Sequence, residues 1–147
     1  MSTHVEQEEA VAAMLAERWE HAAKKIERLA EELPAEKFES RPVEGIRSPA
    51  EVLRHVAFWN QYVADTLRGK KAEDSQNELP AAEYKSKAKV LEVLRGTAKE
   101  AAAALKKQSS GKTAELVLPF IEHTSEHYGQ LAVYARMMGV IPPASRG

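Results

Sequence analysis

Three of the five histidines in this 147-residue chain occupy positions from which they could bind one metal ion. His123 and His127 are four residues apart in the stretch 120–138, and at about 100° per residue both project from one face of a helix. A cation held between helices needs donors of this kind, fixed by rigid backbone and screened from water. Two histidines make an incomplete site, so a third ligand must come from elsewhere in the chain.

His55 is the candidate for that third ligand, because it shares the inward face of a predicted helix with apolar residues. Buried imidazoles without partners would cost about 1 to 3 kcal/mol for each unsatisfied group, whereas a divalent cation satisfies three ring nitrogens at once. We therefore predict a metal site on His55, His123 and His127. The alternative is three hydrogen-bonded core histidines. His4 and His21 fall outside the apolar stripes, and we predict that both are solvated.

Three neutral imidazoles leave a coordination position open for water or a substrate atom, which is typical of catalytic rather than structural sites. Without carboxylate or thiolate ligands, zinc, nickel and iron all fit this donor set. The sequence does not choose among these metals.

Further residues lie close to the predicted site. Glu126 is about 60° from the first histidine of the pair on a helical wheel and is our candidate for moving a proton, with a purely solvated role as the alternative. Gln130 lies one turn beyond the pair, where it can orient an imidazole or bridge to another helix. Trp59 and Tyr134 are predicted to form core and pocket wall.

The histidines must be positioned by helices, because apolar residues recur at helical spacing through most of the chain. The first helix is predicted over about residues 5–33. The second begins at Pro49, where Ser48 and Glu51 form a capping box, and ends just before Gly69, which suits a left-handed C-terminal residue.

The third helix is predicted over about residues 81–107, followed by a break at 108–112. Residues 113–118 fit either a helical turn or an extended piece. Pro119 can open the last helix or kink one that begins earlier, and we predict a regular helix over Pro119–Met138 that ends at Gly139.

Four amphipathic helices predict an all-α four-helix bundle, with residues 1–147 forming a single domain. The connections at 34–47 and 70–80 are longer than is usual in a simple bundle, so we expect at least one crossover. The second connection is polar and could border the entrance to the site.

Composition excludes several classes of function. The chain has no cysteine, so disulfides, thiolate nucleophiles and cysteine-ligated metals are ruled out. The formal net charge is −1 with basic and acidic residues interspersed, which argues against a nucleic-acid partner. No apolar run is long enough to span a membrane, and the acidic start of the chain does not have the form of a secretory signal. We therefore expect a cytoplasmic protein.

Three stretches, HVAFWN after the capped helix start, SKAKVLEVL, and HTSEHYGQLAVYARMMGVIPP, together resemble the DinB-like (DinB/YfiT) superfamily of small metal-binding helical bundles. The most specific part is the pattern H-x-x-x-H-x-G-Q, which is filled by His123, His127, Gly129 and Gln130. His55 corresponds to the first histidine of that family. The resemblance covers nearly the whole chain.

This resemblance implies an up-down-down-up bundle, a divalent metal on the three histidines, and a homodimer. Some relatives are thiol-dependent S-transferases or isomerases that use bacillithiol, mycothiol or glutathione, while many have no known activity. Our first hypothesis is therefore a metal-dependent enzyme that uses a low-molecular-weight thiol as cosubstrate to act on a small molecule. The alternatives are a metal-dependent hydrolase and a non-enzymatic, dimeric ligand-binding bundle.

Overall fold

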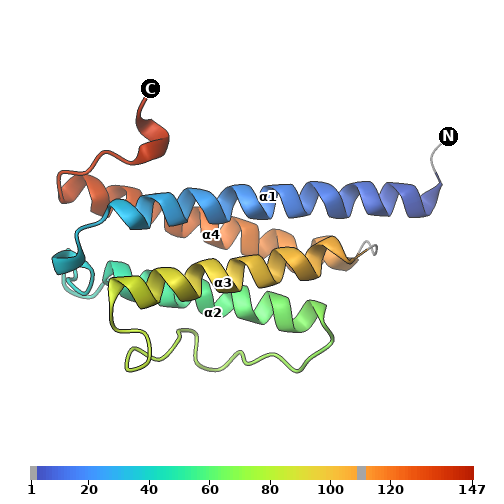
Figure 1. Ribbon diagram of the computed structural model, residues 1–147, viewed down its shortest axis with the longest axis horizontal. Helices are drawn as coiled ribbons and strands as arrows, with labels where there is room; N and C mark the ends of the chain where they lie inside the picture. The colour runs from blue at the N-terminus through green and yellow to red at the C-terminus, as the bar shows by residue number, and fades with distance from the viewer. Residues whose placement is uncertain (1–2, 109–111) are drawn as a thin grey trace.

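The fold is built from four amphipathic α-helices (Figure 1). The computed structural model describes residues 3–108 and 112–147. Within these residues there is no strand, and the helices are α1 (His4–Glu32), α2 (Pro49–Leu67), α3 (Lys87–Lys106) and α4 (Lys112–Met137), with short 3-10 turns at Ala35–Lys37 and Pro143–Ser145. The prediction of an all-α four-helix bundle is confirmed.

The helices follow the up-down-down-up order, because α2 and α3 run in one direction and α1 and α4 in the other (Figure 1). α2 packs most extensively against α3, α1 packs against α4 and α3, and α2 also packs against α4. The connection between α2 and α3 runs back along the bundle, so both helices start at the same end. This crossover makes α2 and α4 antiparallel neighbours, and it is between these two helices that the histidines can meet.

The ends of α2 agree with the sequence prediction. The Ser48 hydroxyl accepts a hydrogen bond from the Glu51 backbone N–H at 3.1 Å, and the Glu51 carboxylate accepts one from the Ser48 N–H at 3.0 Å. Gly69 has a φ of +74°, the left-handed conformation expected after the helix. Gly139 has a φ of +80° and follows α4 in the same way. Local chemistry therefore determines where these two helices stop.

α3 begins at Lys87, so the prediction of a start near Ala81 was wrong by about one and a half turns. The Ser86 side chain caps the helix by accepting a hydrogen bond from the Lys89 N–H. The carbonyl of Tyr84 is engaged by the Arg54 guanidinium at 3.1 Å, which holds the preceding backbone in a turn. Within residues 81–86 only Tyr84 is half-buried, so the helical spacing of the stripe does not extend into this loop.

α4 begins at Lys112, one to two turns earlier than the predicted regular start at Pro119, which lies inside the helix. Pro119 and Glu115, whose carbonyl loses its usual helical donor, are both exposed, so water can hydrate that carbonyl and the helix continues. Of the two possibilities that the sequence left open, the structure shows the helix that begins before Pro119. Of the predicted break at 108–112, residues 109–111 lie outside the described residues.

The core consists of two hydrophobic clusters that follow one another along the bundle. On α4 the first cluster contains Leu131 and Tyr134 and the second contains Val117, so the histidine pair lies between them. No helix among the described residues combines the length and the hydropathy that a membrane crossing needs.

Candidate metal centre

The structure brings His55 of α2 together with His123 and His127 of α4. One ring nitrogen from each lies within 4.8 Å of the others, and among the described residues this is the group of three or more histidines and carboxylates that could hold a metal ion. The Nε2 atoms of His55 and His123 are 2.8 Å apart. Because zinc to nitrogen bonds are about 2.0–2.1 Å long, nitrogens that share one ion lie roughly 3 to 4 Å apart, and the cluster has this scale.

The three imidazoles lie at the edge of the bundle core. His55 is buried, with 6% of its surface exposed, whereas His123 and His127 are half-buried. The buried face of α4 passes through Thr124, which follows His123, and Leu131, which lies four residues after His127. The site is therefore held by packed helices on one side and remains reachable from solvent on the other.

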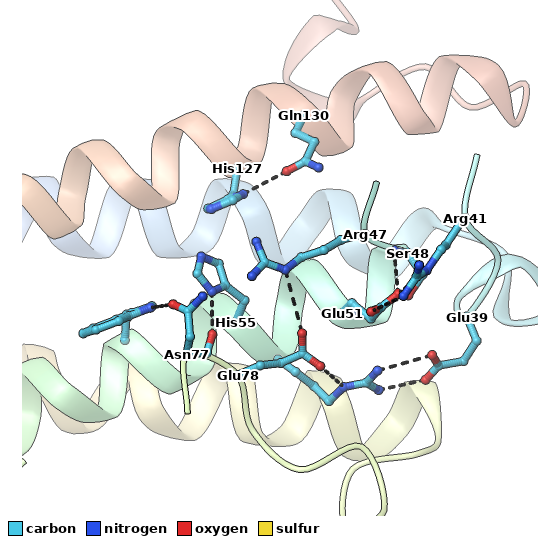
Figure 2. A network of polar contacts seen from close by, with 12 residues as sticks. Glu39, Arg41, Arg47, Ser48, Glu51, His55, Asn77, Glu78, His127 and Gln130 are labelled. Atoms are coloured by element: carbon cyan, nitrogen blue, oxygen red, sulfur yellow. Dashed lines mark hydrogen bonds and ion pairs between the residues drawn. The ribbon is translucent and has the colours of Figure 1, made fainter. Parts of the chain in front are cut away.

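The tautomer of His55 is fixed by the connection that follows α2. Its Nδ1 lies 2.6 Å from the backbone carbonyl of Asn77, and because a carbonyl only accepts, Nδ1 must donate. Nε2 therefore keeps its lone pair and faces the other histidines. Asn77 has a φ of +62°, and its side-chain oxygen accepts a hydrogen bond from Trp59 Nε1 at 2.8 Å. Figure 2 shows the hydrogen bond between His55 and the Asn77 carbonyl.

The tautomer of His127 is fixed by a chain of hydrogen bonds. The Tyr134 hydroxyl donates to the Arg47 carbonyl at 2.8 Å and accepts from the Gln130 amide N–H at 2.7 Å. The Gln130 oxygen must then accept from His127 Nδ1, at 2.9 Å (Figure 2). His127 Nε2 thus carries a lone pair as well. Outer hydrogen bonds of this kind set ring orientation in metal sites.

His123 completes the group, and its environment favours a cation. Without an ion, the 2.8 Å contact between the Nε2 atoms of His123 and His55 requires a proton on one of them. His55 already holds its proton on Nδ1, so His123 must donate. A metal ion removes this requirement because it accepts lone pairs from both nitrogens. The donor set therefore fits a divalent cation.

The imidazoles of His55 and His123 are uncharged at neutral pH. The pKa of His55 is lowered from the ordinary value of 6.5 to about 4, mainly by burial. The hydrogen bond to Asn77 opposes this shift, and the positive charge of Arg47 acts in the same direction as burial. Burial also lowers the pKa of His123 to about 4, with smaller contributions from the neighbouring histidines and Arg47. Neutral rings are the form that binds metals.

An aromatic wall borders the site on the side of the second core cluster. Trp59 stacks on Phe120 with ring centroids 5.6 Å apart, and Tyr62 lies 5.6 Å from the same ring. Phe120 in turn meets His123 edge-on at 6.3 Å. These rings lie on one side of the imidazoles, next to His123. The pocket role of Trp59 stays a prediction.

The other predicted site residues are distributed as follows. Gln130 is half-buried and Tyr134 is buried, and both lie in the chain that ends at His127. Glu126 is exposed and makes no hydrogen bond or ion pair with any described residue, so its role as a base stays a prediction. His4 and His21 are exposed, as expected.

Sequence reasoning missed Asn77 and Arg47. Asparagine tolerates the left-handed conformation, which is a weak signal within the polar connection after α2. Arg47 precedes the N-cap of α2, but it is one of 21 lysines and arginines, and nothing in its spacing distinguishes it. Both residues are brought to the histidines by tertiary contacts alone.

Comparison with known protein families identifies the family of this chain. The family model described as the DinB superfamily matches residues 18–134. This chain belongs to the DinB superfamily. The match contains all three histidines together with Asn77 and the residues of the His127 chain. A search of curated proteins finds no significant match.

Membership of the DinB superfamily and the histidine cluster together suggest metal binding. In this DinB-superfamily protein, the geometry of the three histidines also supports metal binding independently of the family match. Two of the three imidazoles have their Nδ1 protons committed to outer acceptors, and their free nitrogens converge with that of His123.

Replacing Gln130 with alanine should weaken metal binding by roughly 10- to 100-fold, because His127 loses the acceptor that orients its ring. Competition with a coloured chelator measures the affinity. Gln61→Ala is the matched control, because Gln61 bonds Asp65 on the same helix, outside the cluster. Equal affinity in the Gln130 variant and the wild type would show that packing alone orients His127.

Proposed function

We propose that this protein is a metal-dependent enzyme whose cation is held by His55, His123 and His127, and that it uses a low-molecular-weight thiol as cosubstrate. The observation that carries the proposal is the convergence of three imidazoles, with the Nδ1 atoms of His55 and His127 hydrogen-bonded to outer acceptors. The absence of a fourth His, Asp or Glu from this group of described residues supports an open position, as in catalytic sites.

Bound there, a zinc, nickel or iron ion would lower the pKa of a coordinated thiol or water toward neutrality. The residues around the histidines orient the imidazoles and form an apolar wall. Asn77 and Gln130 hold two imidazoles in the ligating orientation. Trp59 and Phe120 form an apolar wall against which the electrophile can lie.

The reaction class that this arrangement suits is sulfur transfer to an electrophilic carbon, or an isomerisation that begins with the same attack. The thiol gives up its proton, its sulfur forms a bond to the carbon, and the leaving group departs with its electron pair. Glu126 is our candidate to carry that proton to solvent, because it is exposed on α4 next to His127.

The test uses protein loaded with cobalt(II), a spectroscopic substitute for the native metal. Adding bacillithiol, mycothiol or glutathione should produce a sulfur-to-cobalt charge-transfer band, and the cognate thiol should support turnover of 1-chloro-2,4-dinitrobenzene. The His123→Ala, His127→Ala double variant is the control and should show neither signal. Glu126→Gln should keep the band and lower turnover if Glu126 moves the proton.

The outcome that contradicts the thiol proposal is a loaded protein that shows no band and no turnover with any of the three thiols. Hydrolysis of an activated ester by the loaded protein without thiol would then support the hydrolase. Metal loading with neither activity would support a ligand-binding bundle, and gel filtration with light scattering would test the proposed homodimer.

A further inference from the structure

Arg47 brings a positive charge to the rim of the candidate metal centre. It lies directly before the N-cap of α2, and 35% of its side chain is exposed, so a ligand from solvent can reach it. Figure 2 shows its guanidinium group directed toward His55 and His127. Its position results from tertiary contacts, because the first connection brings it to α4.

The backbone of Arg47 is fixed by a hydrogen bond, whereas its guanidinium group is held only by a long ion pair with Glu78. The carbonyl accepts the Tyr134 hydroxyl hydrogen bond that ends the chain from His127. The guanidinium Nε lies 3.8 Å from a carboxylate oxygen of Glu78, beyond hydrogen-bonding distance. The other oxygen of Glu78 faces Arg54. Among the described residues, the Arg47 guanidinium has no hydrogen-bond partner, and its five donors are available.

The electrostatics of the site favour an anion. Three neutral imidazoles would leave the charge of a divalent cation uncompensated, and no carboxylate among the described residues belongs to the ligand group. Arg47 adds to the positive potential, because its guanidinium group is directed toward His55 and His127 (Figure 2). An anionic ligand at the open face would offset both charges.

We propose that Arg47 is an anion-binding residue of this site, and that the molecule acted on carries a carboxylate held between the guanidinium and the open face of the metal centre. The planar fork of a guanidinium matches the two oxygens of a carboxylate. This inference rests on the proposed function, because it takes a cation on the three histidines. It adds a substrate class, small carboxylates, that the histidines alone do not specify.

The experiment compares acetate, a minimal carboxylate, with imidazole, a neutral ligand, as titrants of the cobalt(II)-loaded protein, followed by visible absorption. Arg47→Gln should weaken acetate binding roughly tenfold or more, because charge-assisted hydrogen bonds are lost. Imidazole binding should change by less than about twofold, since imidazole makes no ion pair with the guanidinium. Arg47→Lys should fall between wild type and Arg47→Gln for acetate.

Arg41→Gln is the matched control, because Arg41 belongs to the same connection but pairs with Glu51 away from the histidines. It should leave both affinities unchanged. Equal acetate affinity in wild type and Arg47→Gln would overturn the inference, and so would a parallel loss of acetate and imidazole binding. A wild-type protein that takes up no cobalt would instead contradict the metal site itself, so the two failures are distinguishable.

Discussion

Replacing His123 and His127 together with alanine should abolish stoichiometric metal binding while the helical content stays unchanged. Both side chains are half-buried at the edge of the core, so their removal opens little cavity. Each single replacement should weaken binding by more than the roughly 10- to 100-fold that the loss of an outer hydrogen bond costs. Elemental analysis of protein purified without a histidine tag, beside circular dichroism, measures both quantities.

The matched control is His21→Ala, which removes an exposed histidine of α1 that lies outside the cluster. It should retain the metal content of the wild type. Metal retained by the double variant would place the ion elsewhere in the chain. A wild type that stays metal-free after incubation with zinc, nickel or iron(II) would mean that the three residues are core histidines.

Replacing Arg54 with alanine should lower the free energy of unfolding by about 3 kcal/mol, the lower end of what breaking a buried ion pair costs. Its side chain is 2% exposed, and it contacts Glu39 at 2.8 Å, Glu78 at 3.5 Å and the Tyr84 carbonyl at 3.1 Å. The lower end applies because Glu39 is largely exposed and can be rehydrated when Arg54 is removed. Urea unfolding followed by circular dichroism measures the change.

Arg41→Ala is the control for Arg54→Ala, because Arg41 forms an exposed ion pair with Glu51 at 3.0 Å. Pairs of this type contribute about 0 to 1 kcal/mol. If the two variants lose similar stability, the Arg54 network must be hydrated in solution. Arg54→Met separates the loss of packing from the loss of charge, because methionine keeps much of the buried stem.

The Arg54 network also has consequences for the metal centre. Arg54 joins Glu39 in the first connection to Glu78 and the Tyr84 carbonyl in the second. The Arg54 carbonyl accepts a hydrogen bond from the Leu79 N–H at 3.3 Å. Residues 77–79 are therefore held against α2, which keeps the Asn77 carbonyl on His55. Two long connections that contain little regular structure thus help to orient His55, one of the three candidate ligands.

The sequence by itself determined the four helices, the ends of α2 and the three histidines. Helical periodicity, the capping box at Ser48 and the glycine at position 69 are local signals. Each specifies a helix or a helix end through interactions between residues that are close in the sequence. His55, His123 and His127 were found for the same reason, because inward faces of amphipathic helices can be read from spacing. The up-down-down-up order came from family resemblance rather than from spacing.

Only the tertiary structure decided how the site is completed. Arg47 and Asn77 reach the histidines through contacts between distant segments, and their residue types carry no periodic signal. Arg54 acts indirectly, because it holds the second connection against α2. The true starts of α3 and α4 also depended on such context, since the Tyr84 carbonyl binds Arg54 and the exposed Pro119 leaves its helix intact. Side-chain pairing across the chain depends on three-dimensional packing. For that reason the three candidate ligands and Gln130, which lie on one helix face or another, could be predicted from spacing, whereas Asn77 and Arg47 could not.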